Sequence, residues 1–452
     1  MALDTHIPTT TTGGLQAAIR PGDGAYDVAR QTFNLAVDQR PAAIAYPRDA
    51  AEVAQLVREA AAAGLKVGVQ GGAHNAGPQG DLADALLIRT NRMDGVHVDP
   101  LTRKARVQAG VLWEAVVDAA APHGLAALHG SSPDVGVVGY SLGGGLGWLA
   151  RQHGLQSNMI TAVELVTADG AQHRVDADHD PELFWALRGG SGNFGVVTAL
   201  EFGLVPLTHA YAGWLAWDWT HAERVLERWA EWTQGAPDCV TTSARIMQLP
   251  PLPELPEPIR GRKLVVIDGA ILGDPAAAAG SLAALRSLRP ELDTFATIPA
   301  PALCRLHGDP ETPLPTQSSA KMLKALPPAA VSAFVGAAGS DSGSNLVIAE
   351  LRQLGGAVSR PTVGGATAYF DGAYLAFALG MAATPEMAAE TRAQTGRVTD
   401  RLDAWAGGRP YLNFEEEPTD VARAYFPAAL SRLRAVRDRV DPSGMFRANH
   451  VI

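Results

Sequence analysis

Cysteine is nearly absent from this chain of 452 residues, which contains only two. Cys239 and Cys304 are too few and too far apart in sequence to suggest the disulfide framework of a secreted domain, so a reducing compartment is expected. The first eight residues also lack the basic start and the apolar core of a secretion signal. These absences together predict a cytoplasmic protein.

Long apolar runs and an excess of positive charge are absent as well. The alanine-rich stretch Ala60–Ala63 is far shorter than the run of about 18 apolar residues that a membrane span needs. The net charge is −10 and the isoelectric point lies near 5.6. We therefore expect neither nucleic acid nor a membrane as a partner, while the sequence leaves the oligomeric state open.

Several common binding motifs are also missing. No glycine-rich segment ends in Gly-Lys-Ser/Thr, which excludes a nucleoside-triphosphate loop. Gly143–Gly147 lacks the Gly-x-Gly-x-x-Gly spacing of a dinucleotide fold, so NAD is not expected. His307 and Asp309 have no further ligand at metal-binding spacing and are interpreted as part of a turn. Glu415–Glu417 is interpreted as a solvated acidic patch.

Glycine, in contrast, is abundant, with 47 residues. In Val67–Asn75 a short apolar run leads into Gly71, Gly72 and Ala73, whose small side chains let backbone N–H groups approach a large planar cofactor closely. His74 adds a ring nitrogen that can act as a base, a ligand or a nucleophile. Two further glycine-rich segments, 129–148 and 189–195, repeat this theme before apolar or β-branched runs.

These three segments together resemble the PCMH-type FAD-binding domain of the vanillyl-alcohol-oxidase superfamily, and in particular its berberine-bridge-enzyme-like branch of bacterial type. The resemblance continues near the C-terminus in Tyr411–Phe414, Tyr425–Pro427 and Asp441–His450. It covers roughly residues 28–452. It implies an FAD-linked oxidoreductase that acts on a small-molecule substrate and is reoxidised by molecular oxygen.

The expected fold is α+β, with a two-subdomain FAD-binding domain and a substrate domain of antiparallel sheet backed by helices. A helix over 50–63, with Val53, Leu56 and Val57 on one face, and strands near 107–109 and 162–167 belong to the first domain. Strands near 240–249, 263–272, 346–351 and 374–380, with helices over 221–234 and 275–287, belong to the second. We place an N-terminal arm at 1–27, the FAD domain at 28–206, the substrate domain at 207–408 and a returning C-terminal segment at 409–452.

The tryptophans that follow residue 206 are interpreted mainly as core packing rather than as a ligand box. They are Trp214, Trp217, Trp219, Trp229 and Trp232.

The resemblance implies that a histidine in the Gly-Gly-x-His turn, here His74, bonds the flavin 8α-methyl carbon. Many relatives add a second bond from a cysteine, but Ser132 stands at that position, and serine lacks the thiolate that such a bond requires. We therefore predict FAD held by a single covalent bond through His74. The alternative is that His74 only hydrogen-bonds a noncovalent FAD. The full set of predicted cofactor contacts is Gly71, Gly72, Ala73, His74, Asn75, Gly77, Ser132, Val135, Gly136, Gly139, Tyr140, Leu142, Gly143, Gly144, Gly145, Gly147, Gly195, Val197, Tyr411 and Asn413.

Removal of a hydride from a carbinol or amine carbon also needs a base. Glu350, in a predicted strand, is the first candidate, because burial of a carboxylate raises its pKa. Tyr411 is expected to orient the substrate or to share the proton, and Tyr369 is a third candidate. The alternative for Glu350 is a salt bridge with Arg352.

The predicted reaction oxidises an alcohol, a hemiacetal or a reduced ring of a natural product or sugar. An oxygenating or cyclising flavoenzyme, and a flavoprotein without net redox change, are the alternatives.

Overall fold

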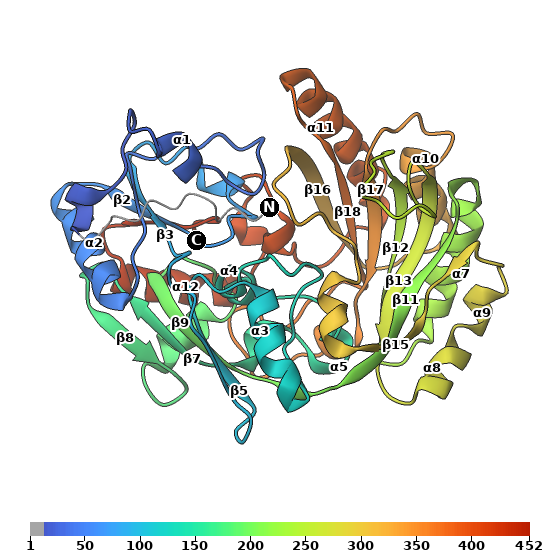
Figure 1. Ribbon diagram of the computed structural model, residues 1–452, viewed down its shortest axis with the longest axis horizontal. Coiled ribbons are helices and arrows are strands. Elements are labelled where there is room, and N and C mark those ends of the chain that lie inside the picture. The colour runs from blue at the N-terminus through green and yellow to red at the C-terminus, as the bar shows by residue number, and fades with distance from the viewer. Residues whose placement is uncertain (1–12) are drawn as a thin grey trace.

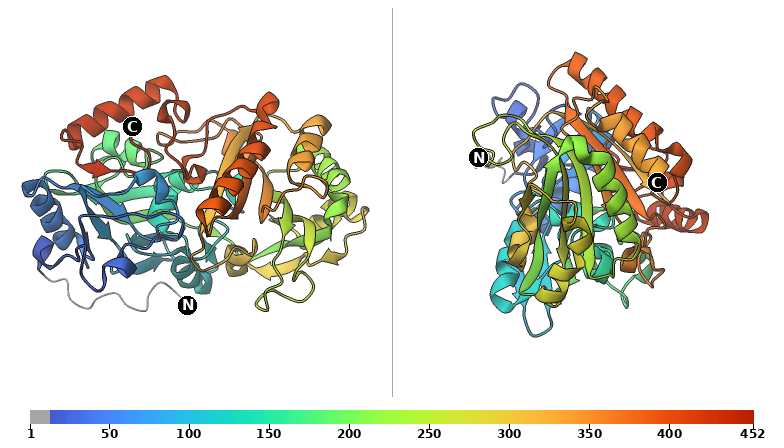
Figure 2. Two further views of the ribbon diagram at one scale, coloured as in Figure 1. Left: turned by 90° about the horizontal axis from the view of Figure 1, so that it is seen from above. Right: turned by 90° about the vertical axis from the view of Figure 1, so that its right-hand side faces the viewer.

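The computed structural model describes residues 13–452, so residues 1–12 of the predicted N-terminal arm lie outside the described residues. Two sheet assemblies lie side by side, the blue and green one formed early in the chain and the yellow and orange one later (Figure 1). The red C-terminal segment returns to the first assembly (Figure 2). The change from the first assembly to the second falls between β10 (Val205–Pro206) and β11 (His209–Asp218).

The first assembly begins with a four-stranded parallel sheet. Its strands, in order, are β1 (Ala43–Ala45), β3 (Ala85–Arg89), β2 (Lys66–Gln70) and β19 (Phe446–Arg447). Helix α2 (Ala50–Ala62) packs on this sheet and starts where the Asp49 side chain accepts the N–H groups of Ala51 and Glu52. Its apolar face, which includes Val53 and Val57, is fully buried, as the 3.6-residue spacing predicts.

A five-stranded antiparallel sheet completes this assembly. Its strands, in order, are β4 (Val96–Asp99), β5 (Lys104–Gln108), β9 (Val196–Gly203), β7 (Ile160–Val166) and β8 (Gln172–Val175). The helices of this part are α1 (Tyr26–Ala29), α3 (Trp113–Ala120), α4 (Val137–Leu142), α5 (Ala150–His153), α6 (Pro181–Leu187) and α12 (Pro427–Val440), and a short ladder joins β6 (Leu125–Ala126) to β10.

The second assembly is an eight-stranded antiparallel sheet. Its strands run in the order β14 (Leu292–Asp293), β11, β13 (Lys263–Ile271), β12 (Val240–Gln248), β17 (Ile348–Gln353), β18 (Tyr374–Met381) and β16 (Thr316–Leu323), with β15 (Ala296–Pro299) also paired to β11. Helices lie on the side of this sheet that faces away from the first assembly (Figure 1). They are α7 (Ala222–Gln234), α8 (Pro275–Ser281), α9 (Ala283–Arg286), α10 (Pro328–Ala338) and α11 (Pro385–Asp400). The opposite face of the sheet turns toward the first assembly, and Ala212 and Ala270 on it pack in one core cluster with Leu128 and Trp148.

The α+β class and the antiparallel second sheet are confirmed. Trp217 and Trp229, at 1% and 0% exposure, lie in the core between the second sheet and its helices, so the core interpretation of these tryptophans is confirmed. The described part of the N-terminal arm is attached to the first assembly, because Ile19 forms a β-bridge with the buried Ile44. Within residues 13–452, no helix combines the length and the apolarity needed to cross a membrane.

Candidate functional site

A cavity of about 440 Å³ lies where the two assemblies and the C-terminal segment meet. The glycine-rich turns form one wall, and alternate residues of β17 and β18, such as Glu350 and Phe377, form another. Residues from Tyr411 to Glu416 and from Phe446 to His450 close it. The predicted cofactor contacts that line it are Gly71, Gly72, Ala73, His74, Asn75, Ser132, Val135, Gly136, Gly139, Tyr140, Leu142, Gly195, Val197, Tyr411 and Asn413.

The remaining predicted contacts, Gly77, Gly143, Gly144, Gly145 and Gly147, do not line this cavity. At four of them, Gly77, Gly143, Gly145 and Gly147, a Cβ would lie less than 3.0 Å from other atoms of the protein. A Cβ at Gly143 would overlap the side chain of Asn413, and one at Gly145 would lie 2.6 Å from the Tyr140 ring. Gly143 and Gly145 therefore leave room for Asn413 and Tyr140, two residues of the cavity wall.

The turn from Gly71 to Asn75 fits the phosphates and ring edge of FAD. Its N–H groups donate to no other described residue, and Ala73 has a left-handed φ of 57°, a conformation that gathers successive N–H groups around an anion. Buried polar atoms of the cavity lining also lack a hydrogen-bond partner among the described residues, among them Asn75 Oδ1, the Tyr140 hydroxyl and His450 Nδ1. Oδ2 of Asp134, the residue before the lining residue Val135, lacks one as well. Such groups are costly unless a ligand or water satisfies them.

His74 is held on two sides. Its ring stacks on Phe33 with centroids 3.7 Å apart, and its Nε2 lies 3.2 Å from the backbone oxygen of Asp134. Burial lowers the pKa of His74, although the charge of Asp134 acts in the opposite direction. Because a carbonyl oxygen can only accept, the neutral ring carries its proton on Nε2, which leaves a lone pair on Nδ1.

Ser132 lines the cavity, and its hydroxyl donates to Asp134 Oδ1 at 2.6 Å. Asp134 was missed by sequence reasoning. Its position two residues after Ser132 carries no signal by itself, because the contact with His74 bridges 60 residues of chain.

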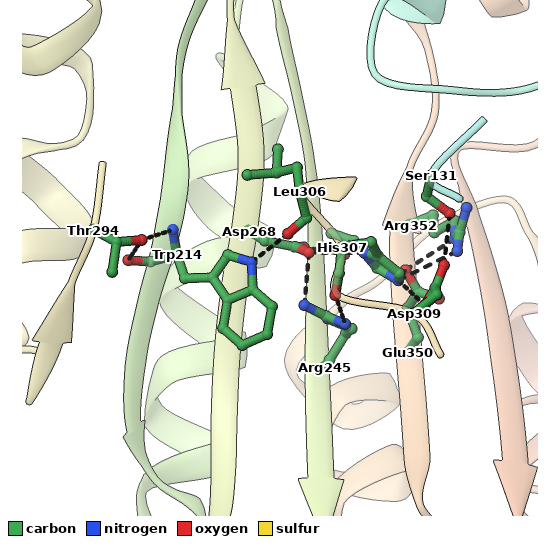
Figure 3. Close-up of polar contacts among 11 residues, drawn as sticks. Ser131, Trp214, Arg245, Asp268, Thr294, Leu306, His307, Asp309, Glu350 and Arg352 are labelled. Carbon is green, nitrogen blue, oxygen red and sulfur yellow. Dashed lines mark hydrogen bonds and ion pairs between the residues drawn. The ribbon is translucent and has the colours of Figure 1, made fainter. Parts of the chain in front are cut away.

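Glu350 belongs to a buried network of charges (Figure 3). Its Oε1 lies 2.9 Å from Arg352 Nε and 3.4 Å from His307 Nε2. Burial alone would raise the pKa of Glu350, but Arg352 and His307 outweigh it and hold that pKa well below its usual range. The expectation of a raised pKa is therefore wrong, and the predicted alternative, an ion pair with Arg352, is present.

His307 connects Glu350 to the strands beyond it. Its Nδ1 lies 2.7 Å from Asp268 Oδ2, which also pairs with Arg245 at 2.7 Å, and all three side chains are essentially unexposed (Figure 3). Burial alone would lower the pKa of His307, but the carboxylates of Asp309, Asp268 and Glu350 outweigh it and raise it to about 9.

His307 does precede a turn at Gly308, but its buried contact with Asp268 shows that the turn interpretation missed its main partners. A signal for the network was present in the sequence, because Asp268 interrupts an otherwise apolar strand.

Tyr411 is buried against Phe414, with ring centroids 5.2 Å apart, and its hydroxyl accepts a hydrogen bond from Asn413 at 3.0 Å. Burial raises the pKa of Tyr411 to about 12, so this phenol keeps its proton near neutral pH. Tyr369 lies outside the cavity lining and packs against Arg409 and Phe426.

Glu416 lies on the cavity wall, half-buried, with the Asn34 amide 3.5 Å from its carboxylate. Burial raises its pKa to about 7. Only Glu417 of the three neighbouring glutamates is exposed, where it pairs with Arg392. The interpretation of this stretch as a solvated patch is therefore wrong for Glu416.

No metal site emerges from the part of the chain that the structure describes. There, no group of three or more His, Cys, Asp or Glu side chains could hold a metal ion.

Comparisons with known proteins agree with this geometry. Residues 41–176 match a family model described as FAD binding domain. The chain is 38% identical to (R)-6-hydroxynicotine oxidase of Paenarthrobacter nicotinovorans over 200 residues, 44% of each chain. It is 36% identical to glucooligosaccharide oxidase of Sarocladium strictum over 180 residues, 39% of this chain and 36% of the relative. The chain thus spans less than half the length of these curated relatives.

Solved structures extend the similarity over the whole chain. 6-Hydroxy-D-nicotine oxidase of Arthrobacter nicotinovorans superposes with a TM-score of 0.81 at 27% identity, covering 99% of this chain and 100% of that one. A berberine-bridge-like protein of Physcomitrella patens gives 0.83 at 21% identity, covering 96% of each chain, and shows the shared fold. The chain therefore contains an FAD-binding domain, is homologous to FAD-linked oxidoreductases and shares its two-part fold with the berberine-bridge-like enzymes.

Proposed function

We propose that this protein is an FAD-dependent oxidase whose flavin is attached covalently through Nδ1 of His74. The observation that carries this proposal is the state of His74, whose Nε2 is tied to Asp134 while Nδ1 keeps its lone pair inside the cavity. The lowered pKa of His74 favours the neutral ring that a nucleophile requires. Ser132 stands where a second covalent bond would need a thiolate, so one bond is expected.

When bound, the flavin supplies an acceptor for two electrons from the substrate, and dioxygen takes them from it. The chain provides the surroundings. The free N–H groups of Gly71–Asn75 bind the anionic or ring-edge oxygens, and the apolar cavity residues exclude water from the flat face. Tyr411 keeps its proton and so can donate a hydrogen bond to the substrate.

The substrate's proton is best accepted by Glu416. A base works well when its pKa lies near the working pH, and the pKa of Glu416 is raised to about 7, whereas Arg352 and His307 keep Glu350 permanently charged. Glu350 then serves, together with its partners Arg352 and His307, as a fixed group of charges that orients a substrate dipole. The competing assignment keeps Glu350 as the base, as the sequence predicts.

The walls of the cavity favour a ring compound over an extended sugar. Ile348, Phe377, Leu379 and Phe414 present apolar and aromatic surface. The negative charge of Glu350 beside them is paired with Arg352 and His307. We propose a reduced nitrogen ring or a similar cyclic substrate that bears an amine or hydroxyl group. The two curated relatives carry both possibilities in their names, hydroxynicotine and glucooligosaccharide.

Anaerobic mixing of the flavin-loaded protein with (R)-6-hydroxynicotine, related cyclic amines and glucooligosaccharides tests this proposal. Bleaching of the flavin absorbance by the cyclic amines, followed by peroxide formation when oxygen is admitted, is the expected result. Reduction by the sugars alone would move the substrate class to oligosaccharides. Reduction with product oxygenation instead of peroxide would favour an oxygenating enzyme, and no reduction by any compound would favour a redox-neutral role.

The location is a separate part of the proposal. We propose a cytoplasmic protein, since both cysteines are free thiols in the structure. Fractionation of cells that express the tagged full-length chain tests this, and recovery outside the cytoplasm would contradict it.

A further inference from the structure

His74 and Ser132 line the cavity, and Asp134 connects their polar groups. The hydroxyl of Ser132 donates to Asp134 Oδ1 at 2.6 Å, and the other carboxylate oxygen, Oδ2, lies 3.7 Å from Nε2 of His74. That second oxygen is buried and has no hydrogen-bond partner among the described residues. The carboxylate is thus fixed by Ser132 on one side and left facing the imidazole on the other.

Asp134 contacts the same ring nitrogen with its backbone and with its side chain. The backbone oxygen, at 3.2 Å from Nε2, sets the tautomer, and any substitution at residue 134 preserves this oxygen. The carboxylate adds a negative charge at the same edge of the ring. Phe33, stacked at 3.7 Å, fixes the plane of the imidazole, so that Nδ1 points away from Asp134.

We propose that Asp134 is the positioning residue for covalent flavin attachment, and that its carboxylate stabilises the positive charge that His74 acquires when Nδ1 forms the bond. This inference rests on the His74 linkage proposed above. In the step, the flavin 8α-methyl carbon loses a proton, a bond forms between that carbon and Nδ1, and the electron pair of the broken C–H bond reduces the flavin. The alkylated imidazolium then releases its Nε2 proton, and dioxygen takes two electrons and two protons to form hydrogen peroxide.

The pH dependence of attachment separates this role from a merely structural one. His74 must be neutral to react, and the two carboxylates that face it, Asp134 and Asp309, both raise its pKa against the effect of burial. The rate of covalent attachment should rise with pH as His74 loses its proton. Removing the charge of Asp134 lowers the pKa of His74, so this rise moves to lower pH. The same change removes the stabilisation of the cationic ring, so the plateau at higher pH falls.

The experiment adds FAD to the flavin-free full-length protein and follows covalent incorporation by flavin fluorescence in denaturing gels, over the pH range in which the protein stays folded. Noncovalent FAD binding is measured separately by quenching of flavin fluorescence. Asp134→Asn should still bind FAD but attach it about tenfold more slowly at the plateau, because the charge that stabilises the cationic ring is lost; a tenfold change corresponds to about 1.4 kcal/mol. Ser132→Ala leaves the charge of Asp134 but removes the hydrogen bond that holds its carboxylate. It should slow attachment less than Asp134→Asn does, and the pH at which the rate rises should not change.

Asp134→Glu keeps the charge and serves as the matched control. In this variant the attachment rate should rise at the same pH as in the wild type and should recover in part, even if Asp134→Asn folds poorly. Equal rates and pH profiles for wild type and Asp134→Asn, or an Asp134→Glu variant no faster than Asp134→Asn, would overturn the role of Asp134. Absence of covalent flavin in the wild type would instead contradict the His74 linkage itself.

Discussion

At the scale of single residues, the two cavity glutamates differ in what surrounds them. Glu350 has two cationic partners within 3.4 Å, whereas Glu416 is faced by Asn34 and Ser318 and by the like charge of Glu417. Sequence alone could not separate them, because the partners of Glu350 come from distant positions and the burial of Glu416 comes from tertiary contacts. The candidate base is therefore Glu416, which no sequence motif indicates, rather than Glu350, which the sequence motif favours.

Glu416→Gln should remove a pH-dependent rise from the rate at which substrate reduces the flavin. In the wild type the rate should rise as pH increases through about 7, where the raised pKa of Glu416 yields the ionised base. Stopped-flow absorbance under anaerobic conditions measures this rate. Glu417→Gln is the matched control and should keep this rise. A variant at position 416 with an unchanged profile would return the assignment to Glu350.

The same glutamate should also affect stability. A carboxyl whose folded pKa is raised, here to about 7, binds protons more tightly when folded, so folding loses stability as pH rises from its unfolded pKa to about 7. Glu416→Gln should therefore raise the melting temperature at pH 8 relative to wild type more than it does at pH 5. Thermal melts at the two values check this. Equal effects at both would contradict the raised pKa.

At the scale of elements, charged residues on strands β12, β13 and β17 are joined by His307. Burial of Arg245 and Asp268 is tolerable because each charge has a partner. The folded pKa of His307 is raised to about 9, so its stabilising effect is complete below its unfolded pKa and is lost as pH rises through about 9. The melting temperature of the wild type should fall from pH 7 to pH 10, and His307→Gln should flatten that fall. A parallel fall in both proteins would contradict the charged state.

The glycine-rich turn near residue 145 gives a prediction at the same scale. Gly145 has a φ of +80°, and a Cβ there would lie 2.6 Å from the Tyr140 ring and 2.7 Å from Gln156. Gly145→Ala should therefore destabilise the protein by about 1–3 kcal/mol. Gly280→Ala, in α8 with no neighbour within 4 Å, is the matched control and should stabilise it by about 0.5–1 kcal/mol. Similar denaturant midpoints for the two variants would contradict this account.

Periodicity predicted many elements well, such as α2 and β13, because one face of each is apolar and the spacing is visible. Strand β16 was missed, since its residues from Thr316 to Leu323 are largely polar and only partly buried. Residues that act through contacts across the fold, such as Asp134 and His307, have no local signature. Sequence reasoning therefore located the turn that carries His74 but not the residues that set its state.

At the scale of the whole molecule, the site depends on three segments that are far apart in sequence but come together in the fold. The C-terminal strand β19 pairs with β2, immediately before the His74 turn, and Asn75 donates a hydrogen bond to the backbone oxygen of Leu412 at 3.1 Å. The sequence indicated this return through the motifs that follow Tyr411. The geometry of the cavity, and so the chemistry of its walls, required the assembled fold.

The most direct test of the central claim is peptide mapping of the native yellow protein by mass spectrometry after denaturation and proteolysis, alongside the His74→Ala variant. The account predicts that the peptide carrying His74 retains the mass of a single flavin cofactor, that the peptide carrying Ser132 is unmodified, and that His74→Ala binds flavin that denaturation releases. Free flavin from the denatured wild type, or flavin on any other residue, would contradict it.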